Sequence, residues 1–128
     1  MSEPKVLFED HGSIAVIKLN RPEKRNALDP ETVMMFNEFS EKAKDPKFRA
    51  VIVTGDESAF CGGADITAAA SEDGMGWKSV EQALNEGYHV GLNNMIYMDK
   101  VVIAAVEGAC AGIAVSYTHL TLPTKEEV

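Results

Sequence analysis

Apolar and polar positions along the chain follow two different periods, and this predicts a succession of strands and helices. Residues 13–19 alternate, so Ala15, Ile17 and Leu19 are expected on one face of a strand and the other side chains on the opposite face. Residues 30–44 instead repeat with the spacing of an amphipathic helix. We predict strands at 5–9, 13–19, 50–54 and 101–106, and long helices at 30–44 and 77–98.

Local signals mark the start and the end of the first predicted helix. Asp29 is expected to cap this helix, and Pro30 suits its first position. Leu28 and Val33 would form a hydrophobic staple across the same start. Asp45-Pro46 then stops the helix. The two strands that precede the helix are expected to pair as a hairpin, which gives the order strand, strand, helix, strand.

The second predicted helix carries an apolar stripe that includes two glycines. The stripe consists of Val80, Ala83, Leu84, Gly87, Gly91, Met95 and Met98. Each glycine should cost about 1 kcal/mol of helix stability, but it would allow a neighbouring element to pack closely. Residues 68–76, which are rich in alanine and glycine, predict a loop before this helix.

Length and charge limit the classes of protein that this chain can represent. A chain of 128 residues fits one domain, and 45% hydrophobic residues can build a core. The net charge of −8 disfavours nucleic acids and anionic membranes as partners, because phosphate binding requires clustered cations. The tight cationic cluster is Arg21, Lys24 and Arg25. Judged from the residues alone, a solvated loop explains it as well as a phosphate site does.

Cys61 and Cys110 lie among small residues, without the spacing of a metal site or of a disulfide framework. This pattern predicts a reducing compartment and no bound metal. We expect Cys61 to be a small buried thiol rather than a nucleophile. The N-terminus lacks the apolar core of a signal peptide, and no apolar stretch is long enough to span a membrane. We therefore expect a cytoplasmic protein.

Two similar small-residue turns, each following a buried strand, are the most informative feature of the chain. The first, after Val51-Ile52-Val53-Thr54, is Ala59-Phe60-Cys61-Gly62-Gly63-Ala64-Asp65-Ile66, and the second lies within 102–112. Glycine and alanine permit sharp turns and let another molecule approach main-chain N–H groups. Two such turns that face one another would supply two N–H donors to a single oxygen, which is an oxyanion hole.

Three motifs in this chain resemble the N-terminal signatures of the crotonase (enoyl-CoA hydratase/isomerase) superfamily. They are Asn20-Arg21-Pro22-Glu23-Lys24-Arg25-Asn26-Ala27-Leu28, Phe60-Cys61-Gly62-Gly63-Ala64-Asp65-Ile66 and Ile103-Ala104-Ala105-Val106-Glu107-Gly108. The likeness runs from about Val6 to Ala114. It implies an α/β fold, the crotonase-like spiral of ββα units, of which this chain would be the truncated, N-terminal half.

The resemblance also implies a substrate and a set of site residues. Members of the family act on coenzyme A thioesters and hold the thioester oxygen between two backbone N–H groups, which here would belong to Ala64 and Ile113. Contacts to the CoA thioester would come from Arg25, Ala27, Cys61, Gly63, Ala64, Asp65, Ile66 and Gly112, with Arg25 near phosphate. No cofactor beyond the CoA thioester substrate is implied, and the parent enzyme would be a homotrimer or hexamer of fatty acid metabolism.

The resemblance does not supply the general acid and base. Hydratases of this family use two glutamates after the second glycine turn; the first aligns with Ser116, and the second would lie past Val128. Thr67 also replaces a lysine that is frequent in the family. Hydratase, isomerase, dehalogenase and decarboxylase reactions therefore remain open for the parent gene.

The last residues depart from the family pattern. Ser116-Tyr117-Thr118-His119-Leu120-Thr121-Leu122-Pro123-Thr124 matches the translation of a transposase sequencing adapter, TCT-TAT-ACA-CAT-CTG-ACG-CTG-CCG-ACG. We therefore expect residues 1–114 to be the family domain and residues 115–128 to be a non-native tail. His119 and Tyr117 are accordingly not candidates for catalysis.

Two other classes of protein are alternatives. A glycine-rich phosphate-binding module of the Rossmann type requires a G-x-G-x-x-G pattern that opens a helix, which Gly62-Gly63-Ala64-Asp65 does not supply. The other alternative is a catalytically silent, partly unfolded fragment of an enzyme. Turnover of an enoyl-CoA substrate, or the genomic sequence beyond the Ala114 codon, separates this alternative from an active enzyme.

Overall fold

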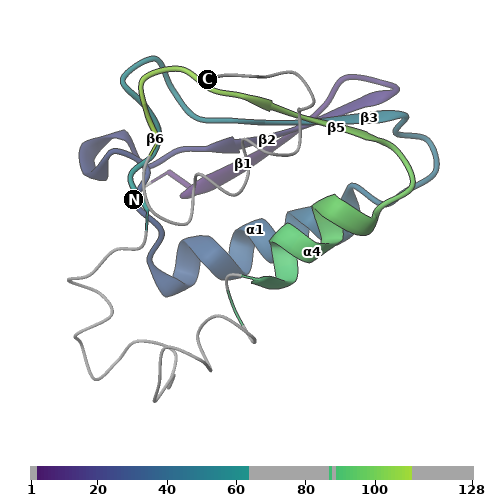
Figure 1. The fold of residues 1–128 in the computed structure, drawn as a ribbon, viewed down its shortest axis with the longest axis horizontal. Coiled ribbons are helices and arrows are strands. Elements are labelled where there is room, and N and C mark those ends of the chain that lie inside the picture. The colour runs from purple at the N-terminus through teal and green to yellow at the C-terminus, as the bar shows by residue number, and fades with distance from the viewer. Residues whose placement is uncertain (1–2, 64–86, 88, 111–128) are drawn as a thin grey trace, which may run out of the picture.

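The computed structural model describes residues 3–63, 87 and 89–110, and Figure 1 shows how they are arranged. Four strands form the main sheet, and two helices lie along one side of it. This is the mixed α/β arrangement that the sequence predicts. The first part of the predicted helix 77–98, except Gly87, lies outside the described residues. So do the expected loop at 68–76 and the expected tail at 115–128.

The main sheet contains the four predicted strands. They are β1 (Val6–Asp10), β2 (Ile14–Leu19), β3 (Ala50–Thr54) and β5 (Val101–Ala105), in the spatial order β1-β2-β3-β5. β1 and β2 form the expected antiparallel hairpin, whereas β2, β3 and β5 run parallel to one another. Parallel neighbours require crossover connections, and helix α1 lies in the connection from β2 to β3.

The first helix begins as the local signals predict. Helix α1 (Pro30–Lys42) has Pro30 in its first turn, and the Asp29 side chain accepts a hydrogen bond from the Thr32 N–H. The helix ends two residues earlier than the predicted Lys44. Lys100 contributes to this end, because its Nζ donates to the carbonyls of Ala43 and Asp45, each at 2.8 Å. The bond to Ala43 satisfies one of the carbonyls that the end of a helix leaves without a partner.

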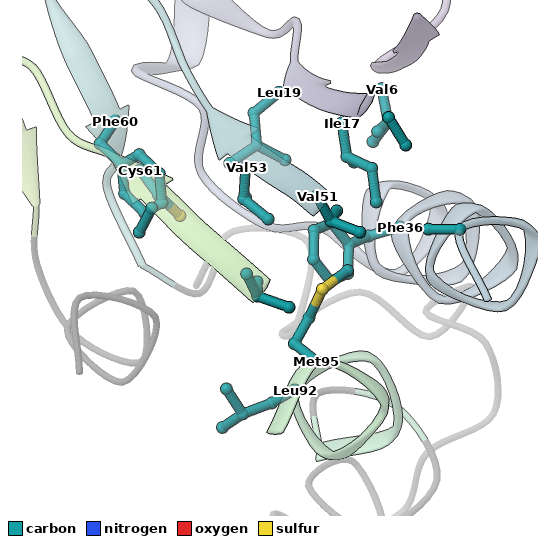
Figure 2. Close-up of a cluster of buried hydrophobic side chains, with 14 of the residues drawn as sticks. Val6, Ile17, Leu19, Phe36, Val51, Val53, Phe60, Cys61, Leu92 and Met95 are labelled. Atoms are coloured by element: carbon teal, nitrogen blue, oxygen red, sulfur yellow. The ribbon is translucent and has the colours of Figure 1, made fainter. Parts of the chain in front are cut away.

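The core lies between the main sheet and the two helices. Ala15, Ile17 and Leu19 of β2 are buried, as the alternation predicts. Figure 2 shows Ile17, Val51 and Val53 from the sheet pointing toward Phe36 of α1 and Met95 of the second helix. That second helix is α4 (His89–Tyr97), which coincides with the end of the predicted helix 77–98. Leu92, which is not on the predicted stripe, is also buried there.

Two short strands and one short helix were not predicted. Strands β4 (Ala59–Cys61) and β6 (Ala109–Cys110) pair in parallel as a second, two-stranded sheet. The 3-10 helix η1 (Pro22–Lys24) interrupts the connection between β2 and α1. In the part of the chain that the structure describes, no helix has the length and apolar character needed to cross a membrane.

Candidate functional site

The second sheet joins the two small-residue turns identified in the sequence. β4 opens the first turn and β6 lies in the second, and the two strands run in the same direction. Their register pairs Ala59 with Ala109 and Cys61 with Cys110. The structure therefore places the two segments side by side as far as Cys61 and Cys110. The predicted site residues that follow, Ala64, Asp65, Ile66, Gly112 and Ile113, lie outside the described residues.

Two glycines permit the close approach of the chain around β4. A β-carbon at Gly55 would lie 2.4 Å from the Phe60 carbonyl oxygen, and one at Gly108 would lie 2.4 Å from the Ser58 carbonyl oxygen. No side chain fits at either distance. Gly108 also has a φ of +69°, and Gly63, just after β4, has a φ of +91°. Both angles are in the region that glycine adopts more easily than other residues.

The loop between β2 and α1 is bound to the turn after β4. The Leu28 N–H donates to the Gly63 carbonyl at 2.7 Å, and the Asn26 Nδ2 donates to the Ala59 carbonyl at 2.9 Å. A β-carbon at Gly62 would lie only 3.2 Å from the Arg25 carbonyl oxygen. The structure thus brings the predicted site residues Arg25, Ala27, Cys61 and Gly63 into one region. They come from segments more than 30 residues apart in the sequence.

The hydrogen bonds inside this loop determine which groups it can offer to a ligand. The main-chain N–H groups of Arg25, Asn26 and Ala27 donate to the carbonyls of Pro22, Arg21 and Lys24, at 2.8–3.0 Å. Arg25 and Asn26 both have left-handed backbone angles, with φ of 53° and 57°. Because these N–H groups already have acceptors within the loop, a ligand bound here would meet carbonyl oxygens and side chains. The exposed side chain of Arg25 is one of them.

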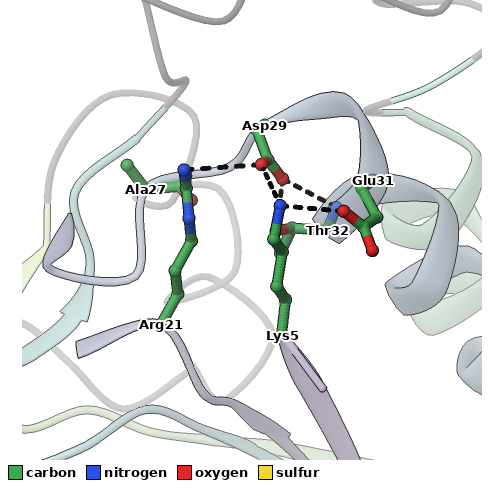
Figure 3. A network of polar contacts seen from close by, with 6 residues as sticks. All are labelled: Lys5, Arg21, Ala27, Asp29, Glu31 and Thr32. Carbon is green, nitrogen blue, oxygen red and sulfur yellow. Dashed lines mark hydrogen bonds and ion pairs between the residues drawn. The ribbon is translucent and has the colours of Figure 1, made fainter. Parts of the chain in front are cut away.

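An ion-pair network connects the loop to the start of α1 (Figure 3). The Arg21 Nη1 donates to the Ala27 carbonyl at 3.0 Å, and Arg21 Nη2 lies 3.4 Å from Asp29 Oδ2. The Lys5 Nζ lies 2.6 Å from the same carboxylate and 2.8 Å from Glu31. The side chain of Arg21 is only 11% exposed. Arg21 is therefore a structural group, which corrects the expectation that all three cations were either solvated or available to phosphate.

The environment of Asp29 favours its ionised form. Burial opposes ionisation, but the hydrogen bonds from Lys5 and Thr32 and the charge of Arg21 outweigh it and lower the pKa of Asp29. The same contact acts in the opposite direction on its partner, because the hydrogen bonds to Asp29 and Glu31 raise the pKa of Lys5. Asp29 and Lys5 are thus both charged at neutral pH, and the network fixes the position of the loop against the helix.

Cys61 is a buried thiol, as the sequence predicts. Its side chain is 1% exposed, and its Sγ accepts a hydrogen bond from the Gly63 N–H at 3.4 Å. Burial raises the pKa of the Cys61 thiol to about 11. A thiol with this pKa carries very little thiolate at neutral pH, so it is a poor nucleophile. Within residues 3–63, 87 and 89–110, no group of three or more His, Cys, Asp or Glu side chains gathers as a metal site.

Sequence reasoning missed two parts of this region. Asn26 is completely buried and makes side-chain contacts to two segments. The preference of asparagine for left-handed backbone in tight turns was the available signal. The pairing of Arg21 with Asp29 depends on how the loop folds back onto α1, and nothing in the local sequence indicates it.

Solved structures that superpose on this chain identify the class of its fold. An enoyl-CoA hydratase/carnithine racemase from Magnetospirillum magneticum superposes with a TM-score of 0.79 at 27% identity, covering 93% of this chain and 45% of that one. An enoyl-CoA hydratase/isomerase from Mycobacterium paratuberculosis superposes with a TM-score of 0.67 at 29% identity, covering 91% of this chain and 42% of that one. The fold is therefore crotonase-like.

The amino-acid sequence gives the family directly. Residues 9–116 match the family described as Enoyl-CoA hydratase/isomerase, so the chain belongs to the enoyl-CoA hydratase/isomerase family. It is 37% identical over 107 residues to carnitinyl-CoA dehydratase of Citrobacter koseri, covering 82% of this chain. It is 35% identical over 120 residues to enoyl-CoA hydratase EchA19 of Mycobacterium tuberculosis, covering 87% of this chain. The matched parts are 39% and 42% of those two relatives, so the chain spans about two fifths of their length.

Proposed function

We propose that this chain binds an acyl-CoA thioester and polarises the thioester carbonyl between the main-chain N–H groups of Ala64 and Ile113. The observation that carries the proposal is the register of the second sheet, in which Cys61 pairs with Cys110. Ala64 and Ile113 each follow this pair by three residues. The two proposed donors are therefore equally far along the chain from one pair of neighbouring residues.

Backbone dimensions make a shared acceptor feasible. Paired strands lie about 4.8 Å apart, and three residues span at most about 10 Å. Two turns that start from such a pair can aim their N–H groups at one oxygen. Two preorganised donors stabilise the negative charge that develops on the thioester oxygen, and the loss of one donor typically costs about 3 kcal/mol of transition-state stabilisation. This would acidify the α-carbon of the thioester or activate the β-carbon of an enoyl ester.

The CoA portion would lie along the loop between β2 and α1. Carbonyl oxygens of this loop accept hydrogen bonds, which suits the amino group of adenine, while the exposed guanidinium of Arg25 suits a phosphate. We expect Ala27, Cys61 and Gly63 to contribute through main-chain contacts. Asp65, Ile66 and Gly112 would complete the binding surface around the thioester. These contacts need no metal and no cofactor other than the substrate itself.

The reaction is a separate question from binding. The position that the resemblance assigns to the first hydratase glutamate is Ser116 in this chain. A serine cannot replace a carboxylate as the general base. We therefore propose that this chain binds acyl-CoA without hydrating it, and that turnover belongs to the longer parent protein. For that parent we propose a homotrimer or hexamer located in the cytoplasm.

The direct test measures the polarised carbonyl. Crotonyl-CoA labelled with ¹³C at the thioester carbonyl is bound to the chain, and its infrared stretch is recorded. Two donors should shift this stretch to lower frequency than in water. Ala64→Pro removes one N–H and should reverse most of the shift, whereas Ala64→Ser keeps the N–H and should retain it. A bound thioester with an unshifted carbonyl would refute the oxyanion hole.

A second measurement addresses the reaction. Hydration of crotonyl-CoA is assayed with this chain and with a version completed from the genomic sequence. Activity in the completed version only would support the proposal that this chain binds without turnover. Equal activity in both would refute it and give residues 115–128 a catalytic role. If neither is active although both bind, the parent protein catalyses another reaction of the family.

A further inference from the structure

We propose that Asn26 is a positioning residue that holds the proposed CoA-binding segment, residues 25–27, at a fixed place relative to the turn after β4. The inference rests on the proposed function, because it concerns how the same site is assembled. Asn26 is 0% exposed, so its side chain does not meet a ligand directly. It would act through the main chain that it holds.

The side chain of Asn26 uses both ends of its amide. Its Oδ1 accepts from the Arg21 N–H at 2.7 Å, and its Nδ2 donates to the Ala59 carbonyl at 2.9 Å. The first bond closes the loop on itself, and the second crosses to β4. An aspartate has the same shape but no donor, so it would lose the bond to Ala59 and bury a charge. Both bonds therefore require asparagine.

The backbone at this point is held in a conformation that most residues avoid. Arg25 and Asn26 are consecutive left-handed residues, with φ of 53° and 57°. Asparagine tolerates this conformation, whereas a residue such as Arg25 usually needs surrounding contacts to hold it there. The main-chain bond from the Asn26 N–H to the Arg21 carbonyl, at 2.8 Å, and the two side-chain bonds are the contacts that do so here.

The flanking residues transmit this position to the turn. On one side, the Arg25 carbonyl lies so close to Gly62 that a β-carbon there would be 3.2 Å away. On the other side, the Leu28 N–H donates to the Gly63 carbonyl at 2.7 Å. Gly63 immediately precedes Ala64, the proposed oxyanion donor. A shift of Asn26 would therefore displace the segment that binds CoA from the segment that binds the thioester.

The test compares three variants of the full chain. Asn26→Gly keeps the left-handed backbone but removes both side-chain bonds, and Asn26→Asp keeps the shape but removes one. Asn20→Ala is the matched control, because Asn20 lies in the same motif and, among the described residues, its side chain donates to the Pro4 carbonyl at the molecular surface. Affinity for crotonyl-CoA is measured by calorimetry at low temperature, after circular dichroism confirms that each variant is folded.

We expect Asn26→Gly and Asn26→Asp to weaken the binding of crotonyl-CoA about tenfold or more, and Asn20→Ala to leave it within about twofold. A role in stability alone would lower the unfolding midpoint and leave the affinity of the folded protein unchanged, and that result would overturn the inference. The proposed function itself fails if the unsubstituted chain does not bind crotonyl-CoA.

Hydrogen exchange of single amides tests the role of Asn26 even if the unsubstituted chain does not bind crotonyl-CoA. The Leu28 amide, which donates to Gly63, should exchange at least about tenfold faster in Asn26→Gly, whereas amides of β2 and β3 should keep their protection. Unchanged protection of Leu28 would show that Asn26 does not hold the loop against the turn, whether or not the chain binds a thioester.

Discussion

Asn37 and Gly91 are packed directly against each other where α1 meets α4. A β-carbon at Gly91 would lie 2.6 Å from Asn37 Oδ1 and 2.6 Å from the ring of Phe36. The Asn37 Nδ2 donates to the Gly87 carbonyl at 3.0 Å, while its buried Oδ1 has no hydrogen-bond partner among the residues that the structure describes. Close packing at Gly91 is what the apolar stripe of the predicted helix implies, and the structure confirms it.

The first prediction follows from this contact. Gly91→Ala should improve helix propensity by about 1 kcal/mol, but the new methyl group has no space between Asn37 and Phe36. We expect a net loss of about 1–3 kcal/mol in the free energy of unfolding, measured by urea denaturation. Asn93→Ala, at an exposed position of the same helix, is the control and should be neutral or slightly stabilising. An equally stable Gly91→Ala variant would mean that the two helices pack less tightly than the structure shows.

The second prediction concerns the acid stability that Asp29 contributes. Its pKa in the folded chain lies below the ordinary value of 3.8, so its stabilisation is present above about pH 4 and is lost as the pH falls toward the folded pKa. Asp29→Asn retains a helix cap but loses the ion pairs with Lys5 and Arg21. We expect this variant to be less stable at pH 7 by about 1–3 kcal/mol and to lose less stability on acidification than the parent chain.

Urea denaturation at neutral pH and near pH 3 measures both effects. Asp45→Asn provides the control, since Asp45 is exposed and its carboxylate contacts only the nearby Lys47 N–H among the described groups. The control should follow the pH dependence of the parent chain. If Asp29→Asn also follows it, the carboxylate of Asp29 is not part of a charged network in the folded protein.

The elements of this fold that the sequence predicts are those formed by interactions between neighbours in the chain. The alternation in β2 and the cap at Asp29 involve neighbours in the chain, so the pattern alone predicted them. β4 and β6 contain only three and two residues and consist mostly of small side chains, so they show no period. They exist because they pair with each other across about 50 residues of sequence. The two motifs predicted a site, but only this pairing explains why they meet.

The third prediction concerns the face of the main sheet opposite the helices. Val101 and Ile103 point to this face and are 60% and 42% exposed. Parallel strands usually have both faces covered, so we expect these side chains to promote self-association. The double substitution Val101→Thr and Ile103→Thr should lower the association constant measured by sedimentation velocity. Met34→Gln, an exposed apolar position of α1, should not. A decrease with Met34→Gln alone would place the contact on the helical side.

The last prediction separates the two arginines of the loop, which have the same charge but different environments. Arg25 is exposed, so Arg25→Gln should leave the unfolding free energy within about 0.5 kcal/mol, yet weaken crotonyl-CoA binding several-fold and reduce its dependence on salt. Arg21→Gln removes one of the two cationic partners of Asp29 and the bond to the Ala27 carbonyl, and it should lower stability by more than 1 kcal/mol. Lys44→Gln, at an exposed site two residues after the end of α1, controls for net charge. Calorimetric titrations of each variant with crotonyl-CoA at two salt concentrations supply the comparison. If Arg25→Gln and Lys44→Gln weaken binding equally, general electrostatic attraction of the anionic ligand, rather than contact of Arg25 with a phosphate, explains the effect.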